Sequence, residues 1–405
     1  MTEGGALSFQ YGSDKLENLK YPSYSVLRSK FDKWLADKAE EAGVMLTEGF
    51  LVDELVVEDG KVVGVMTGGE EFDADVVILA DGVNSLLAQQ IGMKQELEQK
   101  DVAVGVKEVI ELGEDVINER FGLTGNDGAA WMMAGDPTGG NLGGGFIYTN
   151  KDSLSLGIVT TISDIGRVDV SVPDMVERMK AHPAIAPFLK GGKLKEYSAH
   201  LVTEGGLKMM PELVRDGVLV AGDAAAMVVN LGYTVRGMDL AIESGRLAGE
   251  AVIKAKNRND FSAESLSIYK TLLEESFIMK LMKQYQNLPG LLEDHIIFND
   301  FPKMAEETIA AAGGKPMMII FNKIDAYTYI EKAEDDLTPR TKANWSLEEL
   351  MRTWMAKMED NCLFISAREK TNLEQLKEVV YQRVKELHVQ KYPYNDFLYQ
   401  QYEES

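Results

Sequence analysis

Two apolar runs that each end in an acidic residue beside a glycine constrain the fold of this chain more than any other feature. The run DVVILADG ends at Asp81-Gly82, and the run GVLVAGD ends at Gly222-Asp223. Continuous β-branched runs of this kind are typical of strands buried in a parallel sheet. Ligands of open α/β sheets bind beyond the carboxyl ends of the strands, where both turns would lie. The sequence therefore predicts an α/β protein with a binding site at that edge.

A third segment, Leu231 to Asp239, is predicted to open a helix beside these turns. A carboxylate such as Asp223 can accept hydrogen bonds from the hydroxyl groups of a ribityl chain. Free N–H groups at a helix start can stabilise an anion such as the pyrimidine edge of a reduced flavin. Each acid-glycine pair alone is most simply a turn. The three segments together, in this order, favour a flavin site.

Between the two turns the pattern changes to that of an antiparallel lobe. Runs such as VAVGVKEVI, GGGFIYTN and SLSLGIVTTI alternate with glycine-rich turns between residues 101 and 200. The predicted organisation is an FAD-binding domain over residues 1–100, an antiparallel substrate or quinone lobe over 101–205, the continued FAD-binding domain with a helical segment over 206–303, and a separate α/β unit over 316–405. Near the start, residues 25–43 are predicted to form an amphipathic helix with Val26, Phe31, Trp34, Leu35 and Ala39 on its apolar face.

Composition excludes several classes of function. The net charge of −23 argues against a nucleic-acid partner, because such binding needs clustered lysine and arginine. Cys362 is the single cysteine, so no disulfide forms within the chain and no iron–sulfur cluster finds its usual four ligands. The four histidines show no metal-ligand spacing. We expect no secretory signal, no membrane-spanning segment and a cytoplasmic location.

Several stretches closely resemble the FixC branch of the electron-transfer-flavoprotein:quinone oxidoreductases, over nearly all of residues 5–303. The resemblance implies FAD as cofactor, electrons received from a two-subunit electron-transfer flavoprotein, and delivery toward quinone or a ferredoxin-like partner that carries the cluster. It also implies that Arg28 and Asp81-Gly82 approach the FAD, that Gly222-Asp223 and Ala224 meet its ribityl and pyrophosphate region, and that Gly237 and Met238 offer N–H groups to the flavin ring. The stretches are YSVLRSKFDKWL (24–35), DVVILADGVNSL (75–86), AVGVKEVI (103–110), NERFGL (118–123), GGGFIYTNKDSLSLGIV (143–159), EYSAHLVTEGG (196–206) and DGVLVAGDAAAMVVNLGYTVRGMDLAIESG (216–245).

One departure from that family concerns its dinucleotide-binding motif. The family begins with a strand, a G-x-G-x-x-G turn and a helix, and no G-x-G-x-x-G occurs in this sequence. The resemblance therefore predicts an N-terminally truncated FAD-binding domain with an incomplete parallel sheet. Weakened FAD binding and an unpaired strand edge are the expected consequences.

The last part of the chain carries a different pair of motifs. Asn322-Lys323-Ile324-Asp325 follows an apolar strand, and Ser366-Ala367 ends a later one. An aspartate so placed can accept both guanine N1–H and N2–H, and backbone N–H groups at the second site can meet guanine O6. Residues 308–404 resemble the C-terminal part of the HflX family of ribosome-associated GTPases. No G-x-x-x-x-G-K-[ST] exists in the sequence, so the motifs are predicted to be vestigial parts of a partial P-loop-GTPase α/β unit.

Two hypotheses about function follow from these patterns. The first is an FAD-dependent electron-transfer oxidoreductase, impaired by truncation. The second is a non-catalytic chimeric fragment with partial guanine-nucleotide motifs. The methionine-rich stretch 277–282 is predicted to pack in a helical core, with a quinone-entry or peripheral membrane contact as the alternative.

Overall fold

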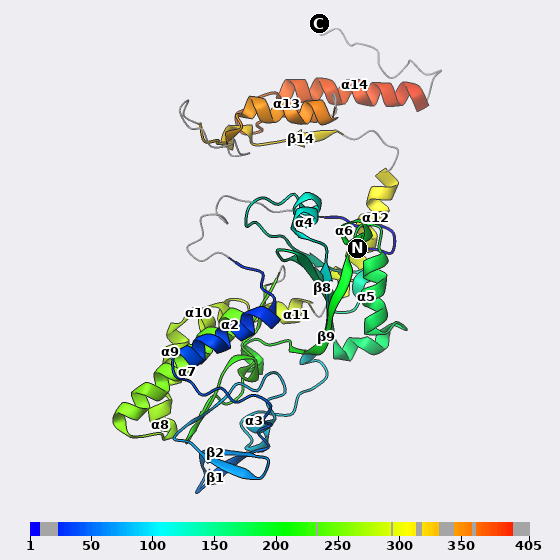
Figure 1. Cartoon of the computed structure of the whole chain (residues 1–405). Helices are drawn as coiled ribbons and strands as arrows, with labels where there is room; N and C mark the ends of the chain where they lie inside the picture. The colour runs from blue at the N-terminus through cyan, green and yellow to red at the C-terminus, as the bar shows by residue number, and fades with distance from the viewer. Residues whose placement is uncertain are drawn as a thin grey trace. The chain divides into compact units, whose positions relative to one another are not determined.

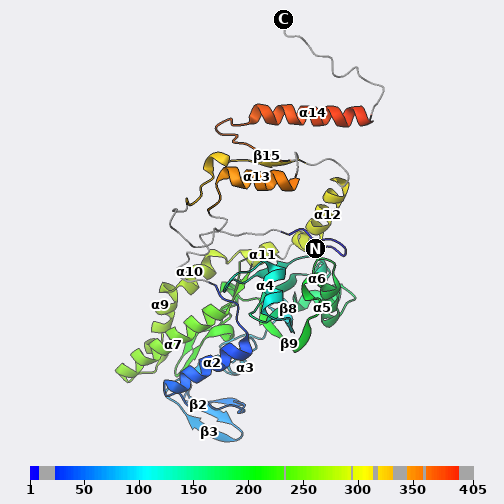
Figure 2. The ribbon, with the colours of Figure 1, turned by 45° about the horizontal axis from the view of Figure 1, so that its top comes forward.

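The computed structural model describes residues 1–8, 23–231, 234–292, 295–312, 318–331, 344–358 and 362–391 (Figure 1). The chain divides into two compact units, Met1–Ala311 and Ala312–Ser405. Within the first unit, helices α4 to α6 lie with strands β8 and β9, while α7, α9 and α10 follow one another in a separate group (Figure 2). The finer division into domains predicted within the first 303 residues stays a prediction.

A small sheet brings the two acidic turns together. Strands β4 (Val77–Leu79) and β11 (Val218–Val220) pair in parallel, with Leu79 opposite Val220, and β10 (Val214–Arg215) pairs antiparallel with β11. The amide of Ala221 continues the ladder by donating to the carbonyl of Leu79 at 2.9 Å. Because the strands are parallel and in register, the turns that follow them leave the same edge of the sheet, as the sequence predicted.

A hairpin precedes this sheet. Strands β1 (Glu54–Glu58) and β2 (Lys61–Thr67) are joined at Asp59 and Gly60, whose φ angles of 48° and 83° are the left-handed pair that a two-residue hairpin turn needs. Strand β3 (Glu70–Asp73) completes the three-stranded sheet. The loop between β10 and β11 holds it against the parallel sheet, because Val62 N–H donates to the carbonyl of Asp216 at 3.0 Å.

An antiparallel sheet lies between Val102 and Thr203. Its five strands run in the order β6-β7-β8-β5-β9, and every neighbouring pair is antiparallel. Helix α5, which begins after the Ser171 cap, packs its buried methionines and valines on one face of the sheet. The remaining elements are β5 (Val102–Glu111), α4 (Glu114–Phe121), β6 (Ala130–Met133), η1 (Asp136–Thr138), β7 (Gly143–Thr149), β8 (Ser153–Thr161), η2 (Ile162–Arg167), α5 (Val172–Ala181), α6 (Ala186–Leu189) and β9 (Lys193–Thr203).

The chain then returns to the parallel sheet and covers it with helices. Tyr269 of α9 is fully buried, and its hydroxyl donates to the carbonyl of Val220 in β11 at 3.2 Å. One hydrophobic core joins these helices to β4 and β11, and Met279 and Met282 belong to it, which confirms core packing for the methionine-rich stretch. The elements are η3 (Leu207–Met209), η4 (Gly222–Ala225), β12 (Val229–Asn230), β13 (Val235–Arg236), α7 (Met238–Arg258), α8 (Ala263–Leu266), α9 (Ile268–Glu275), α10 (Phe277–Gln284), α11 (Leu288–Leu292), η5 (His295–Ile297) and α12 (Asp300–Ala312).

Two expectations about burial are wrong. Helix α2 (Arg28–Glu41) forms where predicted and ends with Gly43 at φ 93°, yet it contains no buried residue, and Trp34 is 53% exposed. Ile78, at the centre of the strand expected to be buried, is 40% exposed. Periodicity shows which side chains share a face, and it does not show what covers that face.

The second unit contains a short parallel pair of strands. Strand β14 (Ile319–Phe321) pairs with β15 (Cys362–Phe364), and the rings of Phe321 and Phe364 stack with centroids 4.5 Å apart. The pair is accompanied by η6 (Ile324–Ala326), α13 (Leu347–Met358) and α14 (Leu373–Lys391). Over both units, no helix within the described segments is long and apolar enough to cross a membrane.

Candidate functional site

The carboxylate of Asp81 is turned back onto its own chain. Ser85 is fully buried in the left-handed region at φ 44°, and its hydroxyl donates to Asp81 Oδ1 at 2.9 Å. The amide of Leu87 donates to the other oxygen at 3.4 Å. Asp81 thereby satisfies a free N–H at the start of α3 (Leu86–Gln90), as capping carboxylates do. Gly82, at φ 83°, turns the chain between them.

Asp223 behaves differently, although it occupies the matching turn after β11. Its side chain is half-buried, and no hydrogen bond reaches its carboxylate from any residue in the described ranges. Burial raises the pKa of Asp223, while the positive charges of Arg28, His200 and Lys94 act to lower it. A half-buried carboxylate that faces cations and lacks intrachain donors is an acceptor ready for a ligand's hydroxyl groups.

The turn that carries Asp223 is anchored by a hydrogen bond to helix α7. Gly222 has φ 64°, a left-handed conformation that favours glycine, and its N–H donates to Ser244 Oγ at 2.9 Å. Ser244 lies in α7 and is fully buried. Ala224, also fully buried, fixes the other side of the turn. The backbone of the turn is therefore anchored to α7, while Asp223 stays half-buried.

Helix α7 begins beside this turn with no side-chain cap. Gly237 is its N-cap residue, and a Cβ there would lie 3.1 Å from Val228 Cγ2, so glycine permits close packing. Met238 is the first helical residue and is 38% exposed. The first N–H groups of a helix have no intrahelical partner, so this 21-residue helix can offer them to a ligand. The predicted segment also includes Gly232 and Tyr233, which lie outside the described residues.

Arg28 is the first residue of α2 and lies near the same turn. Its guanidinium donates to Asp32 Oδ1 at 2.6 Å, and this hydrogen bond is the main reason that the pKa of Arg28 is raised. The charge of Asp223 raises it further. Of the predicted cofactor residues, Arg28 and Asp223 thus face each other electrostatically, while Asp81 is engaged within its own turn.

Sequence reasoning missed two cations of this cluster, Lys94 and His200. Lys94 is buried, and the charges of both Asp81 and Asp223 act on it. His200 is exposed on β9 of the antiparallel lobe. Neither residue carries a motif, because each reaches the turns through the fold rather than through spacing along the chain.

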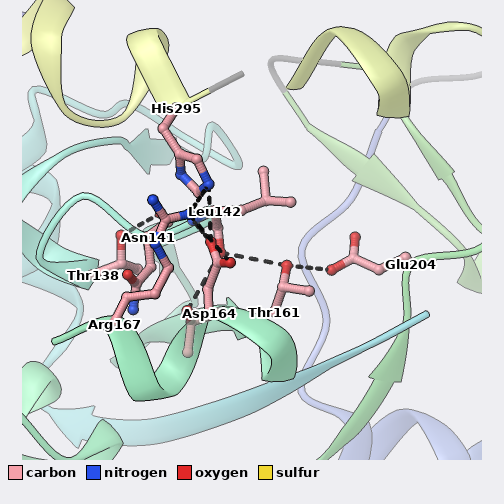
Figure 3. A network of polar contacts seen from close by, with 9 residues as sticks. Thr138, Asn141, Leu142, Thr161, Asp164, Arg167, Glu204 and His295 are labelled. Carbon is pink, nitrogen blue, oxygen red and sulfur yellow. Dashed lines mark hydrogen bonds and ion pairs between the residues drawn. The ribbon is translucent and has the colours of Figure 1, made fainter. Parts of the chain in front are cut away.

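A second group of polar side chains lies where the antiparallel lobe meets the returning chain (Figure 3). The hydroxyl of Thr161 donates to Glu204 Oε1 at 2.7 Å, and Asp164 accepts the amide of Leu142 at 2.9 Å. His295 Nε2 lies 3.6 Å from Asp164 Oδ2. Burial, together with the charge of Asp164, raises the pKa of Glu204. No group of side chains within the described ranges has the composition of a metal site.

The turn that follows Glu204 reaches the flavin candidate site. The amide of Gly206 donates to the carbonyl of Val228 at 2.8 Å, and Val228 is the residue that packs against Gly237 at the start of α7. In the sequence, this turn (EGG at 204–206) is distinguished only by the family resemblance. Its position beside α7 became visible only in the folded chain.

The guanine-edge motifs of the second unit are brought together. Asn322 follows β14, and its Oδ1 accepts the amide of Ala367 at 3.0 Å and that of Lys323 at 2.7 Å. Ser366 forms an isolated bridge with Thr371. Lys323 adopts a left-handed φ of 65°, and Asp325 lies in η6 directly after it.

Comparison with known proteins identifies the larger unit. Protein FixC of Salmonella typhi is 53% identical over 305 residues, covering 75% of this chain and 71% of that protein. A protein of Escherichia coli K12 described as "probable electron transfer flavoprotein-quinone oxidoreductase YdiS" is 50% identical over 307 residues, covering 76% and 72%. The chain belongs to the FixC family. The expectation of an FAD-dependent oxidoreductase is confirmed at the level of this family.

More distant comparisons agree with the fold of the FixC family. A family model described as tryptophan halogenase matches residues 7–104. The crystal structure of a geranylgeranyl bacteriochlorophyll reductase-like protein from Thermoplasma acidophilum superposes with a TM-score of 0.54 at 22% identity, covering 68% of this chain and 65% of that chain. This likeness shows the α/β fold alone. The expected resemblance to HflX-type GTPases finds no support in these comparisons and stays a prediction.

Proposed function

We propose that this chain is an FAD-dependent oxidoreductase that passes electrons from an electron-transfer flavoprotein toward quinone or a ferredoxin-like partner. The observation that carries the proposal is the half-buried Asp223 carboxylate at the shared edge of β4 and β11, which has no donor among the described residues and lies in the field of Arg28 and Lys94. The YdiS relative, described as a "probable electron transfer flavoprotein-quinone oxidoreductase", supports the choice of partners.

The residues present fit the ribityl and ring portions of FAD. Asp223 would accept hydrogen bonds from the ribityl hydroxyls, with Gly222 and Ala224 setting the backbone of the turn. The uncapped N–H groups at Gly237 and Met238 would meet the acceptor atoms of the flavin ring. FAD, when bound, supplies two-electron redox chemistry that no side chain provides.

The pyrophosphate portion of FAD is less well provided for. The sequence contains no G-x-G-x-x-G, which is the usual backbone cradle for a dinucleotide phosphate. Arg28 and Gly82 would approach the cofactor from the other side of the cluster, and Arg28 is the group able to meet a phosphate charge. We therefore propose that Arg28 is the residue of this chain that meets the pyrophosphate when FAD binds.

Exposed apolar side chains support a contact with quinone or a membrane surface. Leu291, Phe301 and Met304 are 66%, 54% and 61% exposed along α11 and α12. Large contiguous apolar patches on a surface are typical of interaction sites. Delivery of electrons to a lipid-dissolved acceptor would use such a face, and a peripheral rather than spanning contact is proposed.

The experiment that tests the proposed function is FAD titration of the purified chain, followed by flavin absorption and fluorescence quenching. Asp223→Ala should weaken FAD binding by about 1–3 kcal/mol, since a charged acceptor is lost. Asp37→Ala, at an exposed position of α2, serves as the control and should leave binding unchanged. Equal affinities for the parent chain and Asp223→Ala would remove Asp223 from the site. A parent chain that binds no FAD would favour the alternative, a non-catalytic chimeric protein.

A second candidate function rests on the contact between Asn322 and Ala367. That contact ties the two predicted guanine-edge segments together across β14 and β15, so that Asp325 and the Ser366-Ala367 amides belong to one cluster. We propose residual, weak guanine recognition by residues 316–405. Calorimetric titration with guanosine and adenosine nucleotides tests it. Preference for guanosine that disappears in Asp325→Ala supports it, and equal binding of both bases opposes it.

A further inference from the structure

Lys94 joins the two acidic turns through their backbones. Lys94 comes after α3 in the chain and is buried, with only 7% of the residue exposed. The ammonium Nζ donates to the carbonyl of Val83 at 2.6 Å and to the carbonyl of Ala224 at 3.2 Å. Val83 belongs to the turn after β4, and Ala224 belongs to the turn after β11. One side chain therefore fixes the separation of two segments that are far apart in the sequence.

A buried ammonium group is costly to retain without compensating charge. The structure shows no direct ion pair to Lys94 among the described residues, and its hydrogen-bond partners are neutral carbonyls. Burial accordingly lowers the pKa of Lys94, while the charges of Asp81 and Asp223 raise it. The two carboxylates are thus the groups that make a charged lysine tolerable at this position.

We propose that Lys94 is a positioning residue for the flavin site. Its ammonium group ties the two acidic turns together and supplies a buried positive charge that attracts the carboxylates of Asp81 and Asp223. The inference rests on the proposed function. It goes beyond that function by assigning a role to a residue that touches neither the ribityl-binding carboxylate nor the start of α7 directly.

The charged groups around Asp223 make this role measurable. Arg28 faces it from α2, His200 faces it from β9, and Lys94 faces it from the segment after α3. Arg28 also holds Asp32, and His200 is exposed, so Lys94 is the buried cation of the three. Replacing Lys94 by a neutral side chain should therefore raise the pKa of Asp223 further. The carboxylate would then take up its proton at a higher pH than in the parent chain.

The test compares Lys94→Gln, which keeps an N–H donor but loses the charge, with Lys94→Arg, which keeps the charge. Lys270→Met, at an exposed position of α9, is the control. FAD affinity is measured by fluorescence quenching from mildly acidic to neutral pH. Lys94→Gln should weaken FAD binding by about tenfold or more at neutral pH, the effect of about 1.4 kcal/mol, and should move the acid loss of binding to higher pH. Lys94→Arg should restore the pH midpoint, and the control should match the parent chain.

A second measurement, chemical unfolding without FAD over the same pH range, separates the two proposals. Lys94→Gln should change the shape of the stability–pH profile, because the titration of Asp223 depends on the charge at position 94. A uniform loss of stability at every pH, with an unchanged pH midpoint for FAD, would show a purely structural lysine and overturn the inference. If the parent chain binds no FAD, the proposed function falls, and the unfolding profiles alone decide whether Lys94 acts on the carboxylates.

Discussion

The hydroxyl oxygen of Ser244 lies 2.9 Å from the amide nitrogen of Gly222, and this contact couples helix α7 to the turn that presents Asp223. The same hydroxyl donates to the carbonyl of Ala241 at 2.8 Å, so both of its roles are filled inside the protein. Because Gly222 is held in the left-handed region by this anchor, the direction of the neighbouring carboxylate depends on a helix more than twenty positions later in the chain.

Ser244→Ala should lower the stability of the first unit. The change leaves the buried amide of Gly222 without its partner, which costs about 1–3 kcal/mol of unfolding free energy. Urea denaturation measures the loss. Ser29→Ala, at an exposed position of α2, is the control and should change stability little. Equal midpoints for Ser244→Ala and the parent chain would show that the anchor does not matter.

Gly217→Ala should disrupt the junction of the β1–β3 sheet with the parallel sheet. A Cβ at Gly217 would lie 1.9 Å from the carbonyl oxygen of Val62, and φ there is 74°. Gly60→Ala provides the matched comparison, because φ is 83° with open space around the position. The strain of the left-handed conformation costs about 1–2 kcal/mol at either site, so the additional loss at Gly217 measures the clash. Thermal unfolding of the two variants gives the difference, and equal losses would contradict the predicted contact.

Glu204→Gln should make the protein more stable at neutral pH. Burial raises the folded-state pKa of Glu204 above its unfolded value, so its contribution to stability is fully present at low pH and is lost as the pH rises through the folded pKa. Glutamine is neutral throughout and can still accept from Thr161. The melting temperatures of parent and variant should therefore converge in acid and separate toward neutral pH. Glu71→Gln, exposed on β3, should follow the parent chain. A gap that stays constant with pH would count against a raised pKa.

Deletion of residues 316–405 should leave the folding and FAD affinity of the remaining chain nearly unchanged. The chain divides between Ala311 and Ala312 into two compact units, so we expect the first unit to fold by itself. Circular dichroism and FAD titration of the shortened chain check this. Unfolding of residues 5–303 in the shortened chain would instead require one integrated protein.

The sequence alone determined the order and type of the elements. Continuous β-branched runs predicted β4 and β11, and alternation with glycine-rich turns predicted the antiparallel sheet. These predictions of secondary structure succeed because backbone preference and side-chain periodicity depend on residues that are close in the sequence. The acidic turns were found for the same reason, since a strand followed by an acid and glycine is a local signal.

Only the tertiary structure decided what each of those residues contacts. Asp81 and Asp223 both lie in a turn that follows a strand. Ser85 donates a hydrogen bond to the carboxylate of Asp81, whereas the carboxylate of Asp223 accepts none from the described residues. Periodicity predicted a buried face on α2, whereas Trp34 is exposed, because burial requires a neighbour that periodicity cannot specify. Lys94 reaches Ala224 across 130 positions of chain, and no local pattern records such a contact. The burial and charge of a residue at a binding edge depend on residues that meet only after the strands have paired. They are therefore set by the tertiary structure, and a local sequence motif does not reveal them.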